Sequence, residues 1–325
     1  MTIRTPLCDL LGIDYPIMLA GMGGVSYGEL AAAVSEAGGF GTLGMASVAP
    51  KDVREQMRIV RSLTKKPFGV DLLAAVPESL EQTADIIIEE GAAAFISGLG
   101  VPAPHLVKKF HDAGLKVMNV AGTVKHARHA EHGGLDAVVA QGTEAGGHTG
   151  KVAGMALIPQ VVDAVKIPVI AAGSIVDGRG LAAALAFGAQ GVWVGTRFIA
   201  SAEAHAGQMY KDVIIEASDE DTIITRSYSG KTMRVFKNPY VMDWERRPQD
   251  IQPFPAQAQL SSRAGVMGGI GGQLEGLDKS KSCFAMGQGA GAVKDAPPAG
   301  EIVRRMVAEA EAVIGRIAGL VKEMK

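Results

Sequence analysis

One short tract of this sequence places two groups that can exchange protons among small residues. The tract, residues 143–150, reads TEAGGHTG and directly follows the apolar run AVVAQG. No apolar residue in it is larger than alanine, and Glu144 and His148 are its titratable residues. Because imidazole takes and gives a proton near neutral pH, His148 is our candidate catalytic acid or base. Glu144 is interpreted either as its hydrogen-bonding partner or as a solvated carboxylate.

The remaining candidates for metal or nucleophilic chemistry lack such a setting. Six other histidines lie in or beside expected helices or on polar faces: His105, His111, His126, His129, His132 and His205. Cys8 and Cys283 are far apart in sequence, so we expect reduced thiols and neither a disulfide framework nor a metal cluster. The sequence has no HExxH, Walker loop or G-x-S-x-G motif, which disfavours metal and serine hydrolases.

A second candidate site follows two apolar runs, PVIAAGSIVDG and VWVGTRF. Gly173 and Ser174 end the first run, Gly178 and Gly180 follow them at a helix start, and Gly195 and Thr196 end the second run. Backbone N–H groups at glycine turns and helix N-termini bind anions, and the last two strands of a β/α barrel commonly carry a phosphate site. We therefore predict a phosphate-binding site at these residues, the alternative being that the glycines only form tight turns.

These groups come together if the apolar runs are parallel strands of one sheet. Eight such runs alternate with amphipathic segments, and the nearly continuous apolar ones are typical of strands buried on both faces. The predicted strands are residues 16–22, 39–44, 68–73, 93–98, 116–122, 137–142, 168–174 and 191–198. Eight successive units predict an α/β fold of the (β/α)8 TIM barrel type.

An open, doubly wound sheet is the alternative fold. It is disfavoured because no strand-to-helix turn carries G-x-G-x-x-G; after Gly21-Met22-Gly23-Gly24, Ser26 stands where the third glycine belongs. In a barrel, sites form at the C-terminal ends of the strands. Met22 at the first strand's end could lie along a flat ring or pack in the core, and Asp71 ends the third strand at the barrel mouth.

The tail changes character after the eighth strand. Residues 202–217 and 300–321 have helical patterns, residues 222–236 show no clear period, and residues 238–259 read as an irregular excursion. We expect a barrel core over residues 1–200. We expect residues 201–325 to be an extension that packs over the barrel mouth within the same structural unit, because it has too few strand or helix signals to bury its own core.

The composition is that of an ordinary globular enzyme. The chain has 325 residues, 47% hydrophobic and 20% charged, with a net charge of −2. Nothing in it favours nucleic acid or an anionic membrane as a partner. We find no signal peptide and no apolar run of about 18 residues. We therefore expect a cytoplasmic protein that acts on a small molecule, and we leave homodimer formation open.

Several longer stretches resemble a known family. They are YPIMLAGMGGVSYGELAAAVSEAGGFGTLG, KPFGVDLL, AQGTEAGGHTGKV and IPVIAAGSIVDGRGLAAALAFGAQGVWVGTRF, with SGKTMRVFKN and FAMGQGAG in the tail. Through them the chain resembles the nitronate monooxygenases, once called 2-nitropropane dioxygenases, and their relatives, the flavin-containing enoyl-acyl-carrier-protein reductases. The resemblance covers nearly the whole chain and implies a TIM barrel that binds FMN.

The resemblance also implies roles for individual residues. The family's active-site histidine falls on His148, and its phosphate contacts fall on the four residues that end the seventh and eighth strands. The implied flavin contacts are Gly21, Met22, Gln141 or Glu144, and Gln288 of the tail. One position departs from the family, which usually has asparagine where this chain has Asp71. An ionised aspartate accepts hydrogen bonds but cannot donate them, so Asp71 either tunes the flavin or turns away from it.

Three functions are open at this point. The first is oxidation of an alkyl nitronate by FMN and dioxygen to a carbonyl compound and nitrite. The second is NAD(P)H-dependent reduction of an enoyl thioester or a quinone. The third is a barrel that binds a phosphorylated metabolite without redox chemistry.

Overall fold

The computed structural model describes residues 3–75 and 77–320, and its centre is a parallel barrel. The barrel strands are β1 (Ile17–Leu19), β2 (Gly41–Gly44), β3 (Phe68–Leu73), β4 (Ala94–Leu99), β5 (Lys116–Ala121), β6 (Ala137–Gln141), β8 (Val169–Ala172) and β9 (Gly191–Val194). They pair in the order β1-β9-β8-β6-β5-β4-β3-β2. A parallel bridge between Met18 and Phe40 joins β1 to β2, which closes the sheet. The predicted (β/α)8 barrel is thus confirmed.

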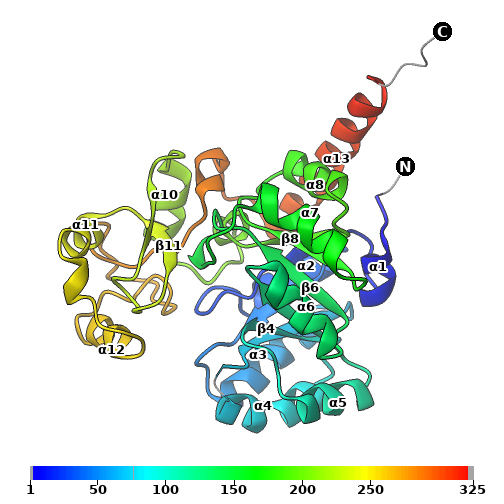
Figure 1. Ribbon diagram of the computed structural model, residues 1–325, viewed down its shortest axis with the longest axis horizontal. Coiled ribbons are helices and arrows are strands. Elements are labelled where there is room, and N and C mark those ends of the chain that lie inside the picture. The colour runs from blue at the N-terminus through cyan, green and yellow to red at the C-terminus, as the bar shows by residue number, and fades with distance from the viewer. Residues whose placement is uncertain (1–2, 76, 321–325) are drawn as a thin grey trace.

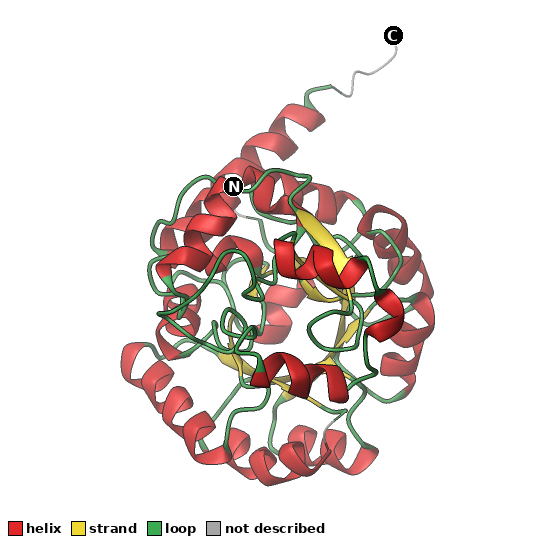
Figure 2. Ribbon diagram, turned by 90° about the vertical axis from the view of Figure 1, so that its left-hand side faces the viewer, coloured by secondary structure: helices red, strands yellow, loops and turns green. Residues whose placement is uncertain are grey.

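Helices form a ring around these strands (Figure 2). They are α2 (Gly28–Glu36), α3 (Pro50–Leu63), α4 (Pro77–Glu89), α5 (Pro104–Asp112), α6 (Val124–His132), α7 (Gly154–Ala164), α8 (Gly178–Ala186) and α13 (Ala299–Ala318). Local signals fix several of their starts. Proline occupies the first turn of α3 and α5, and the Asp177 side chain accepts from the first backbone N–H groups of α8. The apolar faces of the ring and the strands build the main core.

A second apolar cluster fills the barrel interior. It contains inward side chains of the strands, such as Met18, Ile96, Val139 and Trp193. It also contains residues of α1 (Pro6–Leu11), a short helix that the sequence analysis did not predict. Since the apolar side chains of α1 join this cluster, α1 closes the barrel at the end opposite the site described below.

The extension at the C-terminal ends of the strands lies on the left in Figure 1. It contains α9 (Thr196–Ile199), α10 (Gln208–Glu216), β10 (Thr222–Thr225), β11 (Met233–Phe236), α11 (Pro239–Glu245), η1 (Pro248–Asp250), α12 (Ala256–Arg263) and η2 (Gln288–Ala292). Three segments differ from expectation. Residues 222–236 form an antiparallel hairpin, residues 238–259 include α11, and the last residues of the expected eighth strand form α9.

The last helix does not lie over the mouth, where we expected the whole tail. Figure 1 shows α13 beside α8, in the eighth position of the ring. Gly178 allows this close packing, because a Cβ at this position would lie 2.4 Å from the backbone nitrogen of Ala310. Residues 299–318 therefore belong structurally to the barrel.

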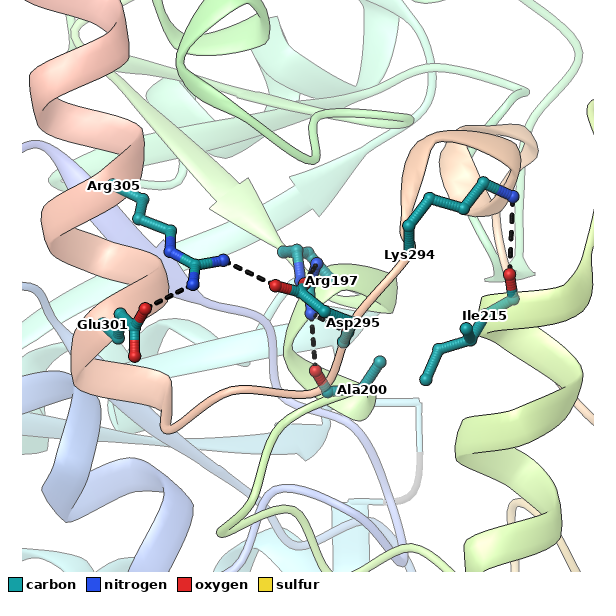
Figure 3. A network of polar contacts seen from close by, with 7 residues as sticks. All are labelled: Arg197, Ala200, Ile215, Lys294, Asp295, Glu301 and Arg305. Carbon is teal, nitrogen blue, oxygen red and sulfur yellow. Dashed lines mark hydrogen bonds and ion pairs between the residues drawn. The ribbon is translucent and has the colours of Figure 1, made fainter.

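A polar network fastens the tail to the barrel just before α13 (Figure 3). Arg197 of α9 is buried, and its guanidinium donates to the Asp295 carboxylate at 2.8 Å and to the Ala200 carbonyl at 2.7 Å. Arg305 of α13 donates to the other Asp295 oxygen at 2.5 Å. Asp295 thus links the end of β9 to the helix that completes the ring.

Candidate active site

The predicted site residues lie at one end of the barrel. Gly21 and Met22 follow β1, Asp71 is in β3, Gln141 ends β6, and Glu144 and His148 lie beyond β6. Gly173 and Ser174 follow β8, while Gly195 and Thr196 follow β9. The carboxyl ends of parallel strands share one edge, so the barrel brings all of them to its mouth.

The backbone of His148 is held by pairing with the tail. Gly147 and His148 form β7, which pairs antiparallel with β11, and Met233 lies opposite His148. The Gln141 side chain donates to the His148 carbonyl at 2.8 Å. Buried Arg234 donates from Nε to the Thr143 carbonyl at 3.1 Å, which fixes the start of the same loop. The tail therefore positions the candidate catalytic residue.

The His148 ring has one protein partner among the described residues. Its Nε2 lies 2.9 Å from the hydroxyl of buried Ser229, and that hydroxyl donates to the Lys231 carbonyl at 3.2 Å. Because the hydroxyl proton is used in this bond, Ser229 Oγ accepts a hydrogen bond from Nε2–H, and Nδ1 keeps a free lone pair. The residue as a whole is exposed, yet desolvation by the surrounding protein, and then the Lys231 charge, lower the His148 pKa. A neutral imidazole at neutral pH fits a general base.

Backbone N–H groups gather at the predicted phosphate site. In the described part of the chain, those of Gly173, Ser174, Gly195 and Thr196 have no protein acceptor. Gly173 (φ +114°) and Ser174 (φ +51°) have positive φ angles, which orient the turn after β8. Unpaired N–H groups at a strand end and at the start of a short helix are suited to an anion.

The start of α8 is not available for the same purpose. The Gly178 N–H donates to the Glu309 carboxylate of α13 at 2.9 Å. The N–H groups of Arg179 and Gly180 donate to Asp177. The first turn of α8 is thus already capped, which leaves the strand ends themselves as the anion-binding candidate.

The tail also contacts the phosphate candidates through its backbone. The Gly287 N–H donates to Thr196 Oγ1 at 3.0 Å, and the Gly289 N–H donates to Ser174 Oγ at 2.9 Å. Between them, the Gln288 N–H donates to the Glu144 carbonyl at 3.0 Å. The Gln288 side chain is exposed, so its predicted contact with a flavin stays a prediction.

Glu144 is not the partner of His148. Both of its carboxylate oxygens lie 3.0 Å from the Gly154 N–H at the start of α7, where a carboxylate is favoured. Glycines make room for it, because a Cβ on Gly142 would lie 2.4 Å from Glu144 Oε2. Glu144 therefore caps α7, which is neither of the two roles that we inferred from its place beside His148. Its implied contact with a flavin stays a prediction.

Met22 and Asp71 occupy the part of the mouth formed by the first strands. A Cβ on Gly195 would lie 3.3 Å from the Met22 sulfur, so this side chain lies beside the end of β9. Its backbone N–H donates to Ser26 Oγ at 2.8 Å, which fixes the turn after β1. The Asp71 side chain is buried, with 7% of the residue exposed.

The sequence analysis missed Ser229, Lys231 and Arg234 as site residues. They lie within the stretch SGKTMRVFKN, whose resemblance to the family was noted without residue-level roles. The described residues contain no group of three or more His, Cys, Asp or Glu side chains that could hold a metal ion. Cys8 and Cys283 are both free and buried. No helix in the described part of the chain has the length and apolar character needed to cross a membrane.

Comparison with known proteins decides the family. Residues 4–309 match the family model described as "Nitronate monooxygenase". The chain belongs to the nitronate monooxygenase family. It is accordingly a flavin-dependent oxidoreductase, and the non-redox alternative is set aside.

Individual members of the family are similar over most of their length. A probable nitronate monooxygenase of Staphylococcus aureus (strain MSSA476) is 33% identical over 303 residues, which covers 80% of this chain and 85% of that protein. One of Staphylococcus saprophyticus is also 33% identical, covering 81% and 86%.

Two solved structures share the fold over nearly the whole chain. FabK from Thermotoga maritima superposes with a TM-score of 0.89 at 36% identity, covering 98% of this chain and all of that one. The nitroalkane oxidase from Streptomyces ansochromogenes superposes with a TM-score of 0.85 at 28% identity, covering 96% of this chain and all of that one.

Proposed function

We propose that this protein is an FMN-dependent nitronate monooxygenase, which oxidises alkyl nitronates with dioxygen to a carbonyl compound and nitrite. The observation that carries the proposal is the joint placement of two groups at one barrel mouth. One is the set of unpaired N–H groups that ends β8 and β9, and the other is the His148 ring held by Ser229. The family assignment supports the same reaction.

The residues at the mouth fit FMN. The unpaired N–H groups of Gly173, Ser174, Gly195 and Thr196 would bind its phosphate. Met22 and the glycines around it offer small and polarisable surface to its ring. When bound, FMN supplies the electron transfer between substrate and dioxygen, which no side chain provides.

His148 would handle the proton of the substrate. A neutral nitroalkane carries an acidic proton on the carbon next to the nitro group, and His148 Nδ1 would take it to give the nitronate. During this step Nε2 would keep its proton and its hydrogen bond to the Ser229 hydroxyl. A substrate supplied as the nitronate has already lost that proton, so His148 would then only orient the anion.

Replacing His148 with asparagine tests this role. We expect turnover of a neutral nitroalkane to fall by about 10²- to 10⁴-fold, the usual contribution of a general base. Turnover of the corresponding nitronate should fall far less. Asparagine at His126, an exposed position on α6, is the matched control and should leave both rates unchanged. Equal losses with the two substrates would refute the base role.

NAD(P)H-dependent reduction of an enoyl thioester or a quinone is the second candidate. One feature favours it: the chain runs from β7 through Gly150 and Lys151 directly into α7, as the sequences of the flavin-containing enoyl reductases do. The similarity to FabK is also higher in identity than the similarity to the nitroalkane oxidase.

Anaerobic mixing of the flavoprotein with each reductant separates the two candidates. Bleaching of the flavin by propyl nitronate, and none by NADH or NADPH, supports the monooxygenase. Rapid bleaching by a nicotinamide overturns it in favour of the reductase. A protein that purifies colourless and does not take up added FMN would overturn both.

A further inference from the structure

The side chain of Asp71 points into the barrel, as the alternation along β3 requires. Gly69, two residues earlier, faces the interior, because a Cβ there would lie 2.7 Å from Ile96 Cδ1 and 2.7 Å from Phe40 Cε1. Both of those side chains belong to the interior cluster. Residues two apart in a strand face the same side, so Asp71 faces the axis one layer nearer to the mouth.

The two oxygens of the Asp71 carboxyl differ in their partners. Oδ1 accepts from the Gly98 N–H of β4 at 2.9 Å. No described residue bonds Oδ2. Glycine is required on both sides, because a Cβ on Gly21 would lie 2.3 Å from Oδ2 and one on Gly98 would lie 2.9 Å from Oδ1. The carboxyl is thus buried with one oxygen free, between the ends of β1 and β4.

No charged group in the described part of the chain compensates this carboxyl. The neighbouring segments GTLG of β2, AFISGL of β4 and LAGMGGVS after β1 contain no titratable residue. Across the mouth, Glu144 and His148 are the titratable groups of the loop after β6, and neither contacts Asp71. Burial therefore raises the pKa of Asp71 well above its usual range, and the Gly98 hydrogen bond only partly opposes this.

We propose that Asp71 is a neutral carboxylic acid whose Oδ2–H donates a hydrogen bond to the bound flavin ring. The proposal rests on the FMN binding proposed above and assigns this chain a flavin-tuning residue. A donor to the ring stabilises the electron-rich reduced flavin, whereas a carboxylate at the same place would repel it. Asp71 thus raises the tendency of the flavin to accept electrons.

Isosteric replacement in the holoenzyme tests the donor. Asp71→Asn keeps a neutral donor of the same size, and Asp71→Ala removes it. We expect Asp71→Asn to retain the wild-type FMN affinity and midpoint potential. We expect Asp71→Ala to bind FMN about fivefold more weakly, the value of one hydrogen bond, and to have a lower midpoint potential. A large rise in midpoint potential in Asp71→Asn would mean that the native side chain is ionised. An unchanged FMN affinity and midpoint potential in Asp71→Ala would mean that the side chain does not touch the flavin. Either result overturns the proposal.

The protonation state is also measurable without flavin. A carboxyl with a raised pKa in the folded state favours folding below the unfolded value of 3.8, and this contribution is lost as pH rises through the folded pKa. In the apoprotein, Asp71→Asn should therefore melt at a higher temperature than the wild type. The difference in melting temperature should be larger at about pH 8 than at about pH 5. A difference in melting temperature that does not depend on pH would overturn the proposal that the carboxyl is neutral. A protein that shows the pH-dependent difference but binds no FMN would refute the proposed function and not the protonation.

Discussion

Ser229 provides a sharp test of how the tail serves the barrel. Its hydroxyl is the one protein group that bonds the His148 ring within the described part of the chain. Replacing Ser229 with alanine leaves Nε2 without this partner, while the Gln141 hydrogen bond still holds the histidine backbone. We therefore expect the His148 backbone to keep its position, whereas the ring loses its fixed orientation and tautomer.

The size of the effect follows from the contacts that are lost. The Nε2–Oγ distance of 2.9 Å is that of a full hydrogen bond, and a neutral one contributes about 1 kcal/mol net. The two bonds between Ser229 and the Lys231 backbone are each 3.2 Å long and add less. A loss of about 1 kcal/mol lowers kcat/KM about fivefold, far less than the about 10²- to 10⁴-fold expected for removing the base itself.

Steady-state kinetics with a nitroalkane and its nitronate measure this effect. The loss in Ser229→Ala should appear with the neutral nitroalkane, and it should vanish in the background of His148→Asn, because Ser229 acts through the ring. An equal factor in both backgrounds would show that Ser229 acts independently of His148 and would refute the reasoning.

A neighbouring serine provides the matched control. Ser227 is fully buried, and its hydroxyl has no hydrogen-bond partner among the described residues. Its backbone carbonyl accepts from Gln257 at 2.6 Å, and alanine preserves that bond. Ser227→Ala should keep wild-type activity and melt no lower than the wild type. A loss as large as that of Ser229→Ala would mean that packing in the tail, and not the ring anchor, controls the rate.

Two further variants test the charge at the site and the closure of the ring. Replacing Lys231 with methionine removes a positive charge that lowers the His148 pKa, so the acid limb of the pH–rate profile should move to higher pH. The shift should be partial, because burial is the larger cause of the lowered pKa and remains. An unmoved acid limb would contradict the assignment of His148 as the general base. Replacing Gly178 with alanine drives a Cβ into the backbone of α13 and should cost about 1–3 kcal/mol of stability, read as a lower Tm, whereas Gly315→Ala on α13, which meets nothing within 4 Å, should raise the Tm slightly.

The barrel was predictable from the sequence because its strands are buried on both faces. Runs such as VVAQG and PVIAAG are nearly continuous in apolar residues, and glycine follows the helices between them. The hairpin of β10 and β11 was missed because burial does not alternate along its strands: three successive residues of β11 are buried, whereas only Thr225 of β10 is. The start of α11 did carry a signal, since Asn238 caps the helix and Pro239 begins it.

The site was predictable where it lies on barrel strands and not where the tail completes it. His148 and the glycine turns follow strands, so their common location comes from the barrel itself. Ser229 is 81 residues from His148, and only the pairing of β7 with β11 brings them together. The interpretation of Glu144 as a hydrogen-bonding partner of His148 was wrong, because nearness in sequence does not show that the carboxylate folds back onto the start of α7.

The position of α13 has a consequence for biosynthesis. The eight strands and seven helices of the barrel are synthesised well before residues 299–318. Until then, the surfaces of α2 and α8 that contact α13 stay uncovered in the nascent chain. α13 also supplies Glu309, which caps the start of α8. Chains interrupted within the tail would therefore display an apolar groove along the barrel wall, the kind of surface that chaperones and proteases of quality control bind. Synthesis of α13 is thus the step that covers the exposed wall of this barrel.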